Sequence, residues 1–371
     1  MFEYQTQIEN VAAVAATHAA ETDRGNFPTA TLAALRESGL FGLVSSADVG
    51  GKGLGLAAAV DVIERLAREC GSSAMILCMH YCATQVLEAL GPVETRRQIA
   101  AGKHLTTLAF SEVGSRSHFW APVGTASADG ANVSLTARKS WVTSARHADS
   151  YVWSSKPLAG GEPSTLWLVP RDTIGLRVAE AAFDGLGLRG NDSSPVTAEA
   201  AVLPASARLG EDGAGFSVMM GTVLPWFNVL SASVSCGLME AAVMKTAAHA
   251  GATHFQHAGS SIADLPTVRA FIARMRIATD QNKALVADAV TAITPGRGDA
   301  MLRVLETKAA AGEAATVVTD LAMRVCGGAA FRKDVGVERV FRDARAALVM
   351  GPTTDVLYDF IGKAVCGLPL F

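Results

Sequence analysis

Arg324-Val-Cys-Gly-Gly-Ala-Ala-Phe331 begins the stretch of sequence that decides the fold. It continues as Val337-Glu-Arg-Val-Phe-Arg-Asp-Ala-Arg345 and ends as Met350-Gly-Pro-Thr-Thr-Asp-Val356. A glycine pair before an aromatic residue, a cluster of opposite charges, and a glycine followed by two hydroxyl residues succeed one another in that order. This ordered block is the most specific feature of the chain, so its neighbours in sequence are interpreted together with it.

Length and composition limit the classes of protein to which the chain can belong. With 371 residues it is long enough for two or three packed units around a substantial core. Half of the residues are apolar and only 18% are charged, which indicates a folded and largely helical protein rather than a disordered one. The 32 basic and 35 acidic residues give a net charge of -3, so no general positive field favours nucleic acid or anionic lipid as a partner.

The six cysteines indicate a reducing compartment. They form no Cys-x-x-Cys pair and no dense framework, so we interpret them as small buried apolar residues and expect no metal site. No basic-then-apolar signal occupies the N-terminus, and the cytoplasm is therefore the expected location.

One uncharged segment, Gly213 to Met239, has the composition of a membrane-spanning helix. However, it contains Pro225, Asn228 and several Ser and Gly residues, and an acidic pair precedes it. We therefore expect a buried core helix here, and no membrane partner.

The hydrophobic period changes twice along the chain and divides it into three parts. Apolar residues recur at helical spacing through residues 1–104, most clearly over Leu56–Arg68 and Ser72–Leu90. Near residue 105 the period falls toward two, and Val, Thr, Ser and Trp become frequent, which predicts a small antiparallel β domain over residues 105–208. Helical spacing returns over residues 209–371, where four long helices are expected, the last from about Ala347. The sequence predicts an α+β protein.

The order of motifs in the C-terminal block resembles the C-terminal signature of acyl-CoA dehydrogenases, and further motifs extend the resemblance over nearly the whole chain. The resemblance implies an N-terminal helical domain, a middle β domain and a C-terminal four-helix bundle. It also implies that FAD is the cofactor, bound between these domains, and that the protein assembles as a homodimer or homotetramer.

Two motifs in the β domain are similar to the segments that hold the flavin ring in this family. Ala109-Phe-Ser-Glu-Val-Gly-Ser-Arg-Ser117 resembles a loop that binds the pyrimidine edge, and Lys139-Ser-Trp-Val-Thr-Ser144 resembles a segment that packs against the isoalloxazine. A tryptophan or threonine of either motif is also compatible with a β core, but the two motifs occur together and at family spacing. The residues implied in flavin binding are Phe110, Ser111, Gly114, Ser117, Trp141 and Thr143.

A second set of residues resembles those that hold the dinucleotide phosphates. Phe255 matches a phenylalanine that reaches the cofactor of a neighbouring subunit, although the arginine that accompanies it in the family is absent here. Gly327 and Gly328 are expected to present backbone N–H groups, because glycine permits close backbone approach to a ligand. Thr353 and Thr354 match a pair of hydroxyl residues near the dinucleotide.

The catalytic base of the family is missing from both places where its members carry one. Gly351 stands where most members have glutamate, and Asn228 stands at the alternative position on the first bundle helix. Proton transfer to a positioned base contributes about 10²- to 10⁴-fold to a rate, and neither residue supplies one. The backbone N–H of Gly351 is still expected to donate to the thioester carbonyl, as an oxyanion-type stabiliser.

Other residues are candidates for proton transfer. His80 and Tyr81 lie in a helix that lines the substrate cavity in the family, and His118 follows the flavin loop. A histidine on an apolar helix is also interpreted as a hydrogen-bonded core residue. Glu112 is expected to brace backbone rather than to act as a base.

Three functions remain open at this point. Loss of the base favours an oxygen-using flavoenzyme, of the monooxygenase or oxidase type, that acts on an acyl- or aryl-CoA thioester or a related small molecule and receives electrons from a flavin or electron-transfer reductant. The alternative is α,β-desaturation with a relocated base. The third interpretation is a flavin-binding or scaffold protein without catalysis.

Overall fold

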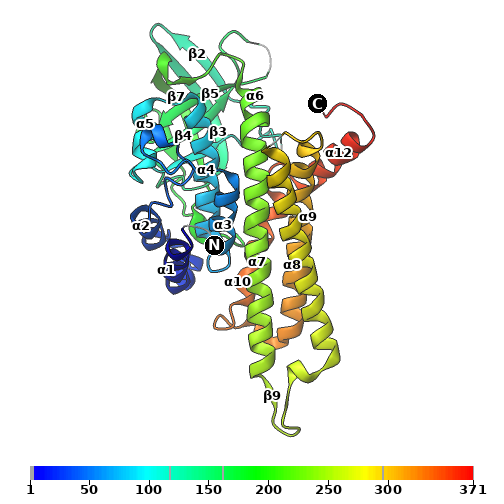
Figure 1. The fold of residues 1–371 in the computed structure, drawn as a ribbon. Helices are drawn as coiled ribbons and strands as arrows, with labels where there is room; N and C mark the ends of the chain where they lie inside the picture. Colours follow the sequence, from blue (N-terminus) through cyan, green and yellow to red (C-terminus); the bar gives the residue numbers. More distant parts are fainter. Residues whose placement is uncertain (1–3, 117, 161–162, 295, 371) are drawn as a thin grey trace.

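The computed structural model describes residues 4–116, 118–160, 163–294 and 296–370, and it has the predicted order of helical, β and helical parts. Five helices form the N-terminal part, which lies beside the sheets and the long bundle (Figure 1). They are α1 (Gln5–Asp23), α2 (Thr29–Glu37), α3 (Leu56–Ala67), α4 (Gly71–Leu90) and α5 (Val93–Ala100). A short 3₁₀ turn, η1 (Ala47–Val49), joins α2 to α3.

Helix α4 is the core element of the N-terminal part, because it is buried on nearly every side. It packs against α3, against strand β1 and against the long helix α7. This explains why its sequence shows apolar residues on all faces rather than on one stripe.

In the residues that the structure describes, the middle part consists of two four-stranded sheets. The first has the order β1 (Thr106–Ala109), β4 (Ser150–Ser155), β5 (Thr165–Pro170) and β8 (Arg208–Leu209). The second has the order β2 (Thr125–Asp129), β3 (Asn132–Val142), β7 (Ser194–Pro204) and β6 (Leu176–Val178). The 3₁₀ turns η2 (Arg189–Asn191) and η3 (Ala205–Ala207) flank β7.

The predicted antiparallel pairing holds for every pair in these two sheets except β1 with β4, which is parallel. The chain leaves β1, forms β2 and β3 in the other sheet, and returns to β4 in the same direction as β1. A crossover of this length is what a parallel pair requires.

The C-terminal part is a bundle in which α7 (Leu224–Ala252), α8 (Pro266–Ile293) and α9 (Ala300–Cys326) pack side by side (Figure 1). The hairpin of β9 (His254–Phe255) and β10 (Ser260–Ser261) joins α7 to α8 at the far tip. The other elements are α6 (Gly215–Val218), a π-helical turn η4 (Met219–Val223), the 3₁₀ turns η5 (Ile262–Asp264) and η6 (Gly327–Phe331), α10 (Val337–Ala344), α11 (Ala346–Val349) and α12 (Thr354–Val365).

The last predicted helix is broken in the structure. Helix α11 ends at Val349, α12 begins at Thr354, and Met350 to Thr353 form a short connection between them. Pro352 explains the break, because proline disfavours helical backbone at the residue before it and cannot donate a helical hydrogen bond.

Among the described residues, two helical stretches have the length and hydropathy of membrane spans. In Gly215–Ala252 the most apolar window is 89% buried inside the protein, which agrees with the predicted core helix. In Ala300–Phe331 the corresponding window is 39% buried.

Contact between α3 and α7 is unusually close, since a Cβ at Gly237 would lie 2.4 Å from the carbonyl oxygen of Glu64.

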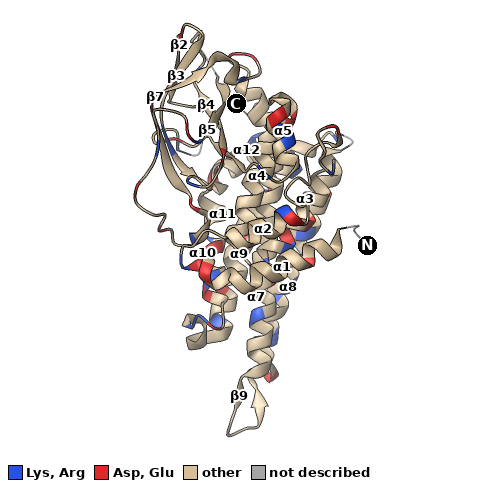
Figure 2. Cartoon of the chain, turned by 90° about the vertical axis from the view of Figure 1, so that its left-hand side faces the viewer, with Lys and Arg blue, Asp and Glu red and all other residues tan. Residues whose placement is uncertain are grey.

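Residues of opposite charge follow one another closely along α5 and α10 (Figure 2). Arg342 on α10 forms ion pairs with Asp23 at 2.6 Å and with Glu338 at 2.6 Å. The pair with Asp23 connects the C-terminal part to the end of α1, and the pair with Glu338 lies within α10. Arg342 also lines the cavity described next.

Candidate active site

A cavity of about 760 Å³ lies where the three parts of the chain meet. Its walls come from α4, from the loops that follow β1 and β3, from residues 183–188, from the start of α7, and from the segment that runs from α10 to Thr353. This volume falls in the range of cofactor and small-molecule sites.

One wall of the cavity is apolar. Met75 and Met79 come from α4, Val223 from the end of η4, Phe227 from the start of α7, and Met350 from the break between α11 and α12. Side chains of this kind exclude water, which strengthens electrostatic interactions inside the cavity.

The loop after β1 and the end of β3 supply the residues predicted to bind a flavin ring. Phe110, Ser111, Gly114, Trp141 and Thr143 all line the cavity. The structure therefore brings together two motifs that are about thirty residues apart in sequence. Ser117, predicted in the same set, lies outside the described residues.

Trp141 is the aromatic face of this wall. Its side chain is 70% exposed although it is large and apolar, and its backbone has a φ of +57°. Its ring meets the edge of Phe183 at a centroid distance of 6.4 Å. An uncovered indole on sparsely populated backbone is typical of a functional site, because an apolar surface of this kind is stabilised when a ligand covers it.

Glu112 braces the two flavin motifs to each other. Its Oε1 accepts a hydrogen bond from Lys139 Nζ at 2.5 Å, and its Oε2 accepts from the N–H groups of Val123 at 2.7 Å and Gly124 at 2.6 Å. Lys139 also donates to Ser154, and burial lowers the pKa of Lys139 to about 8. Since both carboxylate oxygens are held, Glu112 has the bracing role predicted for it.

Neither expected location supplies a base. Gly351 lines the cavity. Asn228 is fully buried one residue beyond Phe227, and its Nδ2 donates to the carbonyl of Val304 on α9 at 3.4 Å. Glu112 is the one carboxylate among the described residues that line the cavity, and that set contains no histidine, tyrosine, lysine or cysteine.

The structure places the three alternative proton-transfer candidates away from the cavity lining. His80 is buried beside Phe41, its Nδ1 accepts from the N–H of Thr106 at 3.3 Å, and burial lowers its pKa to about 3. Tyr81 is also buried and donates to the carbonyl of Leu40 at 2.5 Å. His118 is exposed and meets the edge of Trp120.

The residues predicted to hold the dinucleotide phosphates separate into two groups. Thr353 lines the cavity, and Thr354 is buried beside it with an Oγ1 that has no partner in the described part of the chain. Phe255 lies in the β9–β10 hairpin at the tip of the bundle, and Gly327–Gly328 follow the end of α9 (Figure 1). Phe255, Gly327 and Gly328 are not among the described residues that line the cavity of their own chain.

Comparison with known proteins agrees with this arrangement. Residues 4–102 match the acyl-CoA dehydrogenase N-terminal domain, residues 107–201 the middle domain, and residues 213–366 the C-terminal domain. The chain belongs to the acyl-CoA dehydrogenase family. The predicted family, fold class and three-domain architecture are therefore confirmed.

Individual relatives are distant but cover most of the chain. The protein is 28% identical over 351 residues to the mitochondrial short-chain specific acyl-CoA dehydrogenase of Bos taurus, with 91% of this chain and 83% of the relative covered. It is 26% identical over 360 residues to a probable acyl-CoA dehydrogenase of Mycobacterium leprae, with 94% and 91% covered.

Solved structures share the fold at lower identity. The glutaryl-coenzyme A dehydrogenase complex with glutaryl-CoA superimposes with a TM-score of 0.92 at 22% identity, covering 100% of this chain and 96% of that one. The prolyl acyl carrier protein oxidase AnaB superimposes with a TM-score of 0.88 at 20% identity, covering 98% and 99%.

Members of this acyl-CoA dehydrogenase family are FAD-dependent flavoproteins, so the predicted cofactor is confirmed. The residues present fit that group. Trp141 offers a flat uncovered surface, Ser111 and Thr143 offer hydroxyls, and the Oγ1 of Thr354 is a buried polar atom without a partner next to the cavity. Ser111, Thr143 and Trp141 would hold the ring, and Thr353 and Thr354 the chain that leads from it.

Sequence reasoning missed some of the residues that build this acyl-CoA dehydrogenase site. Phe183, Leu186 and Gly187 line the cavity, in a loop packed so tightly on α10 that a Cβ at Gly187 would lie 2.4 Å from the carbonyl oxygen of Arg342. Lys308 is buried in α9, and its Nζ donates to the carbonyl of Met350, the residue before Gly351. A signal for Lys308 existed, since it occupies the apolar face of α9 at helical spacing from Val304.

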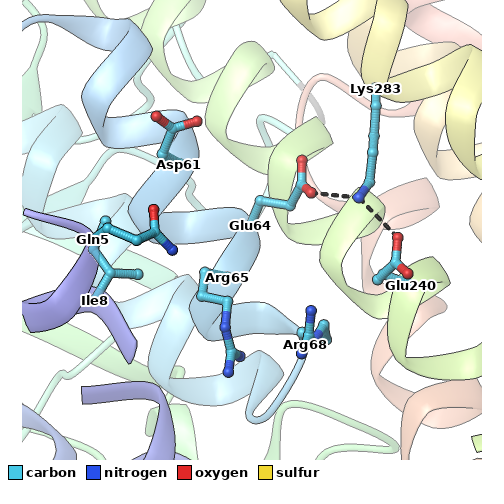
Figure 3. Close-up of a pocket in the computed structure, with 8 residues that line it drawn as sticks. All are labelled: Gln5, Ile8, Asp61, Glu64, Arg65, Arg68, Glu240 and Lys283. Carbon is cyan, nitrogen blue, oxygen red and sulfur yellow. Dashed lines mark hydrogen bonds and ion pairs between the residues drawn. The ribbon is translucent and has the colours of Figure 1, made fainter. Parts of the chain in front are cut away.

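A second, smaller cavity of about 230 Å³ lies between α1, α3, α7 and α8 (Figure 3). Charged residues of both signs line it, and Lys283 bridges Glu64 at 2.7 Å and Glu240 at 2.8 Å. The network joins three helices and is distant in sequence from both flavin motifs, so we assign it a structural role. No cluster of metal ligands is found in the residues that the structure describes.

Proposed function

We propose that the protein is an FAD-dependent oxidoreductase that uses molecular oxygen to oxidise an acyl or aryl thioester or a related small molecule. The observation that carries the proposal is that both carboxylate oxygens of Glu112 are held by hydrogen bonds, so Glu112 is not free to act as a base. It is the one carboxylate in the described cavity lining, and Lys139 and two backbone N–H groups hold both of its oxygens. Desaturation requires a base to remove the α-proton, whereas oxygenation of a bound substrate does not depend on that base.

Bound FAD supplies two-electron redox chemistry and, after reduction, reactivity toward O₂. In a monooxygenation, one oxygen atom enters the substrate and the other leaves as water, with two electrons from an NAD(P)H-dependent or flavin-dependent reductant and two protons from solvent. The protein positions the participants. Trp141 and Thr143 would hold the ring, and the methionine and phenylalanine side chains of α4 and α7 would keep the reacting space dry.

The chain orients the substrate mainly through backbone. Gly351 lines the cavity, and its N–H is the proposed donor to a carbonyl oxygen of the substrate. Thioesters are favoured as substrates because the relatives are named acyl-CoA dehydrogenases, and a solved structure with this fold is named an acyl carrier protein oxidase. Either a CoA ester or a carrier-protein ester presents the same thioester group.

Assembly as a homodimer or homotetramer, in the cytoplasm, is part of the proposal. Phe255 and Gly327–Gly328 are implied cofactor ligands that lie away from the cavity of their own chain, as expected if they serve a second copy. The apolar window of α9 is only 39% buried, which leaves surface for such a contact. Light scattering of the purified protein measures the mass directly.

Desaturation of an acyl-CoA is the second candidate, and the names of the relatives favour it. It requires a base from outside the described cavity lining.

Anaerobic mixing distinguishes the two functions. The FAD-loaded protein is mixed with a series of acyl-CoA esters without oxygen, and the flavin absorbance is followed. We expect no bleaching by acyl-CoA alone, bleaching with an added reductant, and O₂ uptake coupled to product formation on aeration. Rapid bleaching by an acyl-CoA alone would contradict the proposal and support desaturation.

A further inference from the structure

Lys308 is a fully buried lysine that the proposed chemistry does not use. It lies in α9 with 1% of its surface exposed. Its Nζ lies 3.2 Å from the carbonyl oxygen of Ala347, 2.9 Å from that of Met350 and 2.7 Å from that of Pro352. An ammonium group has three N–H donors, so these three carbonyls use all of them. No carboxylate pairs with Lys308 in the described part of the chain.

The three carbonyls surround the connection between α11 and α12, which carries Gly351. The cis peptide bond in the described chain is that between Gly351 and Pro352, so the bonds from Met350 to Gly351 and from Pro352 to Thr353 are trans. In a trans peptide unit the C=O and the N–H point in opposite directions. Because Lys308 holds the carbonyls of Met350 and Pro352 on its own side, the N–H groups of Gly351 and Thr353 are turned away from it.

Gly351 and Thr353 line the cavity, and Lys308 is not among the described residues that line it. Neither the N–H of Gly351 nor that of Thr353 donates to a protein acceptor in the described residues. Two backbone donors without partners beside a water-excluding wall form a site for an oxygen atom that carries partial negative charge.

We propose that Lys308 is the positioning residue that directs the N–H groups of Gly351 and Thr353 into the cavity, where they serve as donors to the ligand and the Gly351 N–H polarises the substrate carbonyl. The part that concerns the carbonyl rests on the thioester substrate proposed above. The part that concerns the backbone does not.

A lysine suits this position for two reasons. The carbonyls of Ala347 and Met350 lie at the C-terminal end of α11, where a cation interacts favourably with partial negative charge. The stem of the side chain packs in the bundle, with Nζ 6.0 Å from the ring centroid of Phe227, another residue of the cavity wall. Burial lowers the pKa of Lys308 to about 7, whereas hydrogen bonds to carbonyl oxygens favour the charged form of an amine.

Lys308→Met tests the proposal, because methionine has a similar length and cannot donate. Lys308→Arg keeps the charge and donors. Lys245→Met is the matched control, since Lys245 is a partly buried lysine of α7 that does not line the cavity.

The first readout is amide hydrogen exchange over residues 346–354 in the FAD-loaded proteins. We expect Lys308→Met to raise exchange there at least about tenfold, because the carbonyls that anchor the segment lose their donor, while Lys308→Arg and Lys245→Met stay near wild type. Unchanged exchange in a folded Lys308→Met protein would overturn the proposal. If Lys308→Met does not fold, the test falls to Lys308→Arg, in which we expect amide exchange over residues 346–354 to stay near the wild-type rate. Faster exchange of this segment in Lys308→Arg would then overturn the proposal.

The second readout is the infrared C=O stretch of butyryl-CoA labelled with ¹³C at the thioester carbonyl. We expect the stretch to move to lower frequency on binding to wild type, to lose at least half of that shift in Lys308→Met, and to keep it in Lys245→Met. A full shift in folded Lys308→Met contradicts the role of Lys308. If wild type gives no shift but exchange over residues 346–354 still depends on Lys308, the thioester proposal fails and the positioning role of Lys308 stands.

Discussion

Replacing Gly351 by glutamate is expected to restore acyl-CoA desaturation. Gly351 lines the cavity, and its φ lies outside the left-handed region, so its backbone conformation does not require glycine. The new carboxylate would lie beside a cavity of about 760 Å³ that has one apolar wall, and no other free carboxylate is present in the described lining. A positioned base contributes about 10²- to 10⁴-fold. This corresponds to about 3 to 5 kcal/mol of activation free energy, at about 1.4 kcal/mol for each factor of ten.

The assay is anaerobic stopped-flow measurement of flavin absorbance after mixing with acyl-CoA esters of different chain length. Gly351→Gln is the matched control, because it has the size of glutamate without its basicity. We expect bleaching by Gly351→Glu, and rates for Gly351→Gln at least about a hundredfold lower. Equal rates for the two variants, with FAD bound in both, would refute the reasoning that the base alone is missing.

Three further predictions concern the flavin motifs and the buried charges. Lys139→Met leaves the Glu112 carboxylate buried without its ion pair, so it should lower the free energy of unfolding by about 3–5 kcal/mol in urea titrations. Adding Glu112→Gln to this variant should recover part of the loss, and no recovery would contradict the pairing. Trp141→Ala should weaken FAD binding about 3- to 10-fold, because aromatic contacts contribute about 0.5–1.5 kcal/mol, and the affinity of Trp141→Phe should be intermediate. Equal FAD affinities of the wild type and Trp141→Ala in a fluorescence titration would exclude contact between Trp141 and the flavin ring. Burial raises the pKa of Asp343 from 3.8 to about 6. The stability gained by proton binding in the folded state is therefore complete below pH 3.8 and is lost as the pH rises through 6. Asp343→Asn should flatten the pH dependence of the free energy of unfolding across that window, and an unchanged slope would argue against Asp343 as its source.

The fold was predictable because its signals are local and ordered. The C-terminal block from Arg324 to Val356 carries turn-forming glycines, charges and hydroxyls in one sequence, and the change from a helical to a strand period near residue 105 marks the β domain. The position of Trp141 and Thr143 on one wall of the cavity was predictable for the same reason, since they lie two residues apart at the end of β3. Their contact with the flavin stays a prediction.

The failures involve contacts between segments that are distant in sequence. Period and composition place His80 and Tyr81 on a helix but do not say which of its neighbours they face, and in the structure they contact Thr106 and Leu40 inside the core. The break at Met350 to Thr353 was missed because helical spacing continues on both sides of it. The role of Lys308 depends on carbonyls about forty residues away, which no periodic pattern reveals.

Deuterium incorporation into a thioester measures the missing base most directly, because it requires neither oxygen nor net flavin reduction. The FAD-loaded protein is incubated anaerobically with acyl-CoA esters in D₂O, and the α-carbon is analysed by mass spectrometry. We expect no exchange above the protein-free rate for wild type and clear exchange for Gly351→Glu. Enzyme-dependent exchange by the wild-type protein would show that a base reaches the α-carbon and would contradict the oxygen-dependent function proposed for this family member.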